Sequence, residues 1–149
     1  QPDLIQSKIA TIEFSLCASR AYLAERGRPK SIGDLRGHRL IGHPPNDEAP
    51  FADPNWLLRV AGVAPEAGEG KTLLLNSMYG IFRAAGAGAG IAALPDYLIA
   101  QDRDLEVLLP DLKRPPVEMY YVYPEERRHS RRIGLFRDYL LRHIAGQKI

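Results

Sequence analysis

Cysteine is nearly absent from this chain. Its 149 residues include a single cysteine, Cys17, which excludes an internal disulfide framework and a cysteine-rich zinc site. A redox sensor would normally need a second, resolving cysteine, so we expect Cys17 to be a buried and unreactive thiol. Such sparing use of cysteine fits a reducing compartment, and we expect a cytoplasmic protein.

The chain also lacks a charge surplus and a long apolar run. Twenty lysines and arginines against 18 acidic residues give a formal net charge of +2, which is too small to predict that this chain itself binds nucleic acid. The longest uncharged, apolar-rich stretch, residues 84–95, contains three glycines and is too short to span a membrane. No signal-peptide pattern follows Gln1. Because the chain begins without methionine, we expect it to be a piece of a longer protein.

Metal, cofactor and catalytic motifs are missing as well. The four histidines do not stand at metal-ligand spacing; they are His38, His43, His129 and His143. Residues 70–72 resemble the end of a phosphate-binding loop, but Pro65 occupies the position of its first glycine. The glycines at 86, 88 and 90 follow a predicted helix, which indicates a helix end and close backbone packing and not dinucleotide binding. With no nucleophile and base to pair, we expect no metal, no cofactor and no enzymatic activity.

Apolar periodicity predicts strands that alternate with helices. The predicted strands cover residues 12–18, 39–41, 56–60, 71–75, 91–94, 105–109 and 117–123. The predicted helices cover residues 20–26, 77–87, 96–100 and a stretch after Ser130, and Ser19 and Asn76 are the expected N-caps of the first two. We predict a proline-containing loop over residues 42–55 and a turn at residues 68–70. The alternation is typical of an α/β fold.

The residues that follow two of the predicted strands are candidates for ligand contacts. Asn76, Ser77 and Tyr79 stand where a strand ends and a helix begins, and the backbone N–H groups of a helix N-terminus favour anions. N-capping by Asn76 is the simpler interpretation, but it accounts for neither Ser77 nor Tyr79. His43 enters the long loop at the end of another strand, where α/β folds place ligand contacts. Simple exposure in the loop is the alternative for His43.

Several segments, taken in order, resemble the effector-binding domain of LysR-type transcriptional regulators. The segments are LCASRAYL (16–23), GRP (27–29), DLRGHRLI (34–41), Asn76, AAGAGAGIAALPDYL (84–98) and VYP (122–124), followed by a basic loop and an amphipathic helix. Each segment is short, but the ordered set covers nearly the whole chain, from about residue 4 to residue 144.

The resemblance implies a particular fold and domain organisation. It implies a lobe of the type II periplasmic-binding-protein kind, in which helices flank a mixed sheet. Residues 14–118 would form subdomain II, and residues 119–149 would supply the return strand and helix of subdomain I. The two-subdomain domain would thus be incomplete, and the winged helix-turn-helix of the family would precede this chain. The two crossings, near residues 9–13 and 119–122, would act as a hinge.

The resemblance also implies a function. A small effector, often an organic anion, would bind in the cleft between subdomains and shift their arrangement. The full-length protein would be a dimer or tetramer that contacts promoter DNA through its absent N-terminal domain, with no membrane partner. The implied effector contacts are Asn76, Ser77, Tyr79 and His43, with Ser19 and Pro95 as further candidates. A periplasmic solute-binding protein and an enzyme on a similar two-lobed scaffold are the alternatives.

Overall fold

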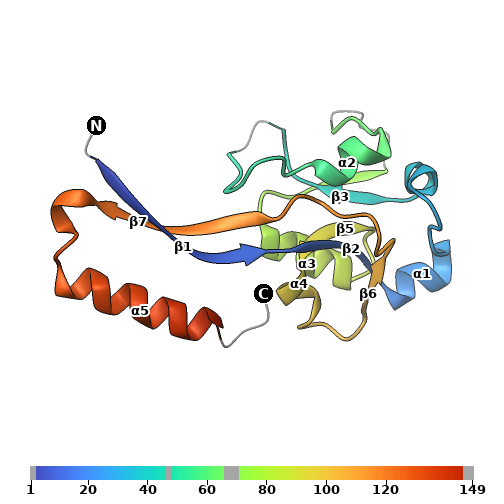
Figure 1. Cartoon of the computed structure of the whole chain (residues 1–149). Coiled ribbons are helices and arrows are strands. Elements are labelled where there is room, and N and C mark those ends of the chain that lie inside the picture. Colours follow the sequence, from blue (N-terminus) through green and yellow to red (C-terminus); the bar gives the residue numbers. More distant parts are fainter. Residues whose placement is uncertain (1–2, 46–47, 66–70, 146–149) are drawn as a thin grey trace. The chain divides into compact units, whose positions relative to one another are not determined.

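The chain divides into two compact units. A computed structural model describes residues 3–45, 48–65 and 71–145 (Figure 1). The larger unit is Phe14–Pro115, and the smaller unit combines Gln1–Glu13 with Pro116–Ile149. The turn predicted at residues 68–70 lies outside the described residues. Among the described residues, no helix has both the length and the apolarity needed to cross a membrane.

The larger unit is built around a buried central strand. Strand β2 (Phe14–Ser19) pairs antiparallel with β5 (Ala92–Pro95) on one side and with β6 (Leu105–Leu108) on the other. All six residues of β2 are buried, and the two polar ones, Ser15 and Ser19, are small. The strand therefore has protein on both of its faces.

A short parallel pair extends this sheet. Strand β3 (Leu40–Gly42) pairs in parallel with β4 (Thr72–Leu74). Ile91, next to β5, forms two backbone hydrogen bonds with the β3 region. The Ile41 N–H donates to the Ile91 carbonyl oxygen, and the Ile91 N–H donates to the Arg39 carbonyl oxygen, both at 2.8 Å. A Cβ on Gly90 would lie 2.5 Å from the Arg39 carbonyl oxygen, so the predicted close approach of backbone at this glycine is confirmed.

Helices cover both faces of the sheet and enclose two apolar clusters. They are α1 (Arg20–Arg26), η1 (Ile32–Gly37), α2 (Trp56–Ala61), α3 (Met78–Gly86) and α4 (Asp96–Ile99). One cluster joins Leu16 and Ala18 of β2 to α2, and the other joins Cys17 to α3 and α4. Because successive side chains of a strand point to opposite faces, β2 supplies both clusters. The sheet is the middle layer of three.

Local end signals in the sequence predict several helix boundaries correctly. Ser19 caps α1, since its side chain accepts a hydrogen bond from the Tyr22 N–H, and Gly27 ends the helix with a φ of 81°. Ser31 and Asp34 form a capping box at the start of η1. These signals depend on neighbours in sequence, which is why they can be read without the structure.

The prediction of a strand over residues 56–60 is wrong. The segment is the helix α2, which Gly62 ends in the left-handed conformation while donating to the carbonyls of Arg59 and Leu58. Leu57, Leu58 and Ala61 are all buried, and their spacing of one and then three residues is that of a helix face. A run of five mainly apolar residues does not distinguish the two structures by itself.

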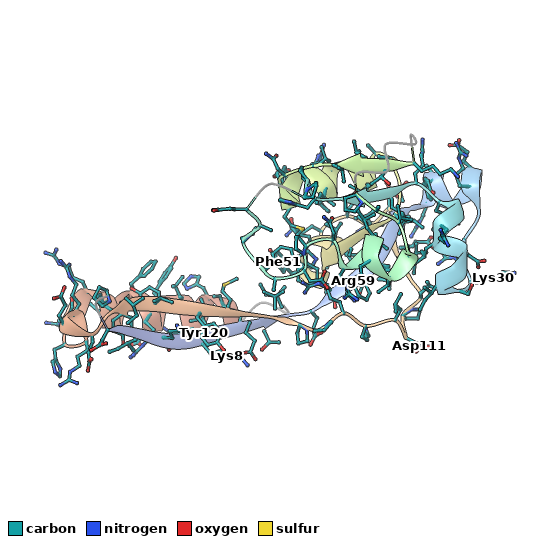
Figure 2. All side chains as sticks on the ribbon, turned by 90° about the horizontal axis from the view of Figure 1, so that it is seen from above. Lys8, Lys30, Phe51, Arg59, Asp111 and Tyr120 are labelled. Atoms are coloured by element: carbon teal, nitrogen blue, oxygen red, sulfur yellow. The ribbon has the colours of Figure 1, made fainter. Side chains whose placement is uncertain are left out.

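The smaller unit is a two-stranded ribbon with one long helix. Strand β1 (Leu4–Ile12) pairs antiparallel with β7 (Val117–Pro124), with a register shift between Lys8 and Ala10. The first eight residues of β1 were not predicted as a strand. Lys8 Nζ lies 2.7 Å from Glu118 Oε1 across the ribbon, and Figure 2 labels Lys8 and Tyr120 on its two strands. After a short turn, η2 (Glu125–Arg127), the chain forms α5 (Arg131–Ala145) beside the ribbon (Figure 1).

Candidate functional site

A cavity opens in the larger unit at the carboxyl ends of β3 and β4. Its volume is about 80 Å³, and its walls come from the ends of these two strands, the 50–55 loop, α2 and the start of α3. Most of the lining is apolar, including Phe51, Leu57, Leu58, Met78 and Ile81. The carboxyl ends of strands are where ligands bind in α/β sheets, so this cavity is the candidate site.

Asn55 fixes the backbone of His43 at the cavity wall. The His43 N–H donates to Asn55 Oδ1 and Asn55 Nδ2 donates to the His43 carbonyl oxygen, both at 2.7 Å. A Cβ on Gly42 would lie 2.8 Å from Asn55 Oδ1, so a glycine is needed for this approach. Sequence analysis did not find Asn55, because its partner lies 12 residues away.

The imidazole of His43 is held by a hydrogen bond to the next residue. His43 is buried, and its Nδ1 lies 3.0 Å from the Pro44 carbonyl oxygen. A carbonyl oxygen can only accept, so Nδ1 carries a hydrogen and donates to it. His43 therefore packs its ring in the wall and is held there through Nδ1.

The start of α3 places Asn76 at the same cavity. The N-cap of α3 is Ser77, whose Oγ accepts from the Gly80 N–H at 3.2 Å. The prediction of Asn76 as N-cap is therefore wrong by one residue. Asn and Ser are both good N-caps, and the helix begins after the second of the two. Asn76 stays outside the helix, is exposed and lines the cavity.

The structure brings two of the six predicted effector contacts, His43 and Asn76, to this cavity. Tyr79 is 61% exposed, and its ring packs against Phe82 with ring centres 5.8 Å apart. Ser19 is buried and caps α1, and Pro95 is buried at the end of β5. None of these three, nor Ser77, is among the described residues that line the cavity.

The lining is suited to binding and holds no acid–base pair among its described residues, which include no carboxylate, cysteine or lysine. Within the described parts of the chain, no group of three or more His, Cys, Asp or Glu side chains could hold a metal ion. Cys17 lies in the core, and burial raises the pKa of its thiol to about 12. The thiol is therefore protonated at neutral pH and unreactive, as predicted.

Arg114 anchors the loop that forms one wall of the cavity, and sequence analysis did not find it. It is buried, and its Nη2 donates to the Ala52 carbonyl oxygen at 2.5 Å and to that of Asp53 at 3.3 Å. Its guanidinium also packs on the ring of Phe51, which is labelled in the larger unit in Figure 2. About 60 residues separate donor and acceptors, so no local pattern signals the contact.

Comparison with protein families and curated proteins gives consistent matches. Residues 1–145 match the family described as the LysR substrate binding domain. The chain is 29% identical over 136 residues to the HTH-type transcriptional regulator YhjC of Escherichia coli K12, covering 83% of this chain and 42% of that protein. It is 25% identical over 126 residues to the HTH-type transcriptional activator AaeR of the same strain, covering 83% and 40%. The chain thus spans about two fifths of the length of these relatives.

Solved structures share the fold. The regulatory domain of CrgA, a LysR-type transcriptional regulator from Neisseria meningitidis, superposes with a TM-score of 0.74 at 23% identity, covering 94% of this chain and 68% of that one. The regulatory domain of AphB from Vibrio vulnificus gives a TM-score of 0.66 at 26% identity, covering 93% and 69%. The α/β fold predicted from the sequence is therefore confirmed.

Proposed function

The chain belongs to the LysR substrate-binding domain family, and from this premise we propose that the cavity at the ends of β3 and β4 forms part of the site for a small organic anion. The matched relatives are transcriptional regulators and not enzymes, so the chain is a regulatory domain of a transcription regulator. The observation that carries the proposal is that His43 and Asn76, on separate segments, line one largely apolar cavity.

The chemistry of the lining supports a carboxylate on a small apolar body. The Asn76 amide supplies two N–H donors, and the N-terminus of α3, whose residues Met78 and Ile81 also line the cavity, adds the positive end of a helix dipole. Apolar side chains from the 50–55 loop and α2 would contact the carbon body. Ser77, Tyr79, Ser19 and Pro95 stay predicted contacts for the parts of the ligand surface beyond this cavity.

The proposal extends to the full-length protein. Residues 14–118 would be subdomain II, and residues 119–149 would be the part of subdomain I that follows it. An effector that binds one arrangement of the subdomains more tightly than another shifts their populations. The intact protein would be a cytoplasmic homo-oligomer that binds promoter DNA through a separate N-terminal domain.

A binding screen on the intact regulator tests this proposal. Small carboxylates, with benzoate as the first probe, are screened by thermal shift, and the best is titrated by calorimetry. Asn76→Ala is expected to weaken binding about tenfold or more, since a hydrogen bond to a charged group contributes roughly 1.5–3 kcal/mol. His43→Ala is expected to weaken it less.

Ser31→Ala is the matched control, because it removes a cap from η1, away from the cavity. It should lower stability by roughly 1 kcal/mol and leave affinity unchanged. The proposal fails if no carboxylate binds the intact protein, or if Asn76→Ala binds as tightly as the wild type.

A further inference from the structure

Arg114 is a buried arginine whose recorded hydrogen bonds all go to backbone carbonyl groups. It is 6% exposed. Besides its bonds to Ala52 and Asp53, its Nη1 donates to the Pro115 carbonyl oxygen at 2.9 Å. Burying a charged group is costly unless its hydrogen bonds are satisfied. A buried arginine at this position therefore indicates a role that an apolar side chain could not perform.

The guanidinium also packs against two aromatic rings. Its Cζ lies 4.7 Å from the ring centre of Phe14 and 5.2 Å from that of Phe51. These distances are within the range of cation–π interactions. The two rings contact each other, with centres 5.5 Å apart. We call Arg114, Phe14 and Phe51 the arginine clamp.

The arginine clamp joins three distant parts of the chain. Phe14 is the first residue of the larger unit, and Arg114 and Pro115 are its last two. Phe51 belongs to the loop between β3 and α2 and lines the cavity. One side chain therefore connects the cavity wall with both points at which the chain passes between the larger and smaller units.

The loop that the clamp holds is fixed in an unusual conformation. Asp53 has a φ of 53°, which is uncommon for a residue other than glycine. Its carbonyl oxygen accepts from Arg114 and also from the Trp56 N–H, at 3.2 Å. A strained residue persists where its surroundings determine it, and here Arg114 and the start of α2 do so.

We infer that Arg114 is a positioning residue of the effector site, which holds Phe51 in the cavity wall and couples that wall to both passages between the units. Occupancy of the cavity then restricts the loop, and the clamp transmits the restriction to residues 12–16 and 113–117. The inference rests on the proposed function for its ligand, but the clamp itself can be tested without one.

Hydrogen exchange measured on the ligand-free, full-length regulator tests the coupling. In Arg114→Met, the amide hydrogens of the non-proline residues in 48–56, 12–16 and 113–117 should exchange at least tenfold faster than in the wild type; the Trp56 N–H, which donates to the Asp53 carbonyl oxygen, reports directly on the loop. Phe51→Leu keeps an apolar wall but removes one ring, and it should raise exchange at 12–16 as well as in the loop. The matched control is Arg59→Gln, which removes an exposed ion pair to Asp53 (2.6 Å) but none of the clamp; both passages should keep wild-type exchange.

The coupling is overturned if Arg114→Met and Phe51→Leu raise exchange in the loop while residues 12–16 and 113–117 keep their wild-type protection. Arg114→Lys keeps the charge without the planar fork that bonds two carbonyls. It should fall between the wild type and Arg114→Met. An intermediate exchange rate in Arg114→Lys would show that the hydrogen bonds of the guanidinium position the loop, and that the side chain does not merely fill space.

A ligand arm uses benzoate on the same proteins at saturating concentration. In the wild type, benzoate should slow exchange in the loop and at both passages. In Arg114→Lys, protection should appear in the loop but not at the passages. Equal protection at the passages in both proteins would overturn the inference. If benzoate does not bind the wild type, the ligand class of the proposed function fails, and the ligand-free comparison alone decides the role of Arg114.

Discussion

The two units of the chain use their apolar residues differently. In the larger unit, apolar clusters fill both faces of the sheet. In the smaller unit, the ribbon and α5 leave large apolar side chains exposed: Met119, Tyr120, Val122, Leu135, Phe136, Tyr139 and Leu141. A two-stranded ribbon has little stability of its own. The larger unit is therefore stabilised by a packed interior, whereas the smaller unit buries few side chains, Ile12 and Tyr123 among them, and retains an apolar surface.

Truncating one leucine in each unit should give the largest difference in stability between the two units. Leu94 is 0% exposed and Leu135 is 57% exposed. Leu94→Ala should lower the free energy of unfolding by about 2–5 kcal/mol, because it leaves a cavity in a packed core. Leu135→Ala should change it by about 0.5 kcal/mol or less.

Urea denaturation provides the measurement. Trp56, the single tryptophan of the chain, lies in the core of the larger unit, so its fluorescence follows that unit, and circular dichroism follows both. Equal losses for the two variants would show that the exposed face of α5 is packed in the intact protein and would end the contrast between the units.

Adding one methyl group to a glycine in each unit should give the next largest effect. In Gly90→Ala, the new Cβ would meet the Arg39 backbone, and such overpacking costs about 1–3 kcal/mol. In Gly134→Ala, no atom lies within 4 Å of the new Cβ, and the replacement favours a helix by about 1 kcal/mol. Melting temperatures should move in opposite directions. An unchanged melting temperature in Gly90→Ala would mean that the backbone at Arg39 can shift to accept the methyl group.

A fall in pH should give the smallest effect, and it should act on the larger unit. The Tyr22 hydroxyl accepts from the Arg39 N–H at 3.0 Å and lies 2.9 Å from His38 Nδ1, to which it can donate its own hydrogen when that nitrogen is unprotonated. Burial lowers the pKa of His38 below its usual value near 6.5. The folded state therefore binds fewer protons than the unfolded state, and stability should fall as pH falls from 7.5 through about 6.5.

Urea midpoints at pH 7.5 and 5.5 measure this loss, and His38→Asn should remove it. Lys8 and Glu118 provide the contrast in the smaller unit. Their mutual hydrogen bond raises the pKa of Lys8 and lowers that of Glu118, so both stay charged across this range. Glu118→Gln should leave the difference between the two midpoints unchanged. If His38→Asn retains the full pH dependence, another group is responsible.

The sequence was informative where structure depends on near neighbours. The Ser19 cap, the helix over residues 20–26 and the helix predicted over residues 77–87, found at Met78–Gly86, depend on local patterns, and all three agree with the structure. The sequence wrongly predicts a strand after Asn55, because a short apolar run fits either structure, and the helix is favoured by burial of its apolar face against the sheet.

The candidate site was predictable only in part, for the same reason. His43 and Asn76 follow neighbouring parallel strands, so strand assignment alone suggests that they lie close together. Asn55 and Arg114 act through backbone groups 12 and about 60 residues away. Every residue has a carbonyl oxygen, so the residue type of such a partner does not reveal the contact. The roles of Asn55 and Arg114 therefore could not be predicted from the sequence.

The burial of Cys17 makes the chain convenient for spectroscopy. Its one thiol is enclosed and protonated at neutral pH, so a maleimide dye would react selectively with a cysteine introduced on the surface. Arg142→Cys would place such a dye on an exposed position of α5, while Trp56 serves as a natural donor in the larger unit. Energy transfer between the two would then report the distance between the units with and without an effector, and so test the proposed change in their arrangement.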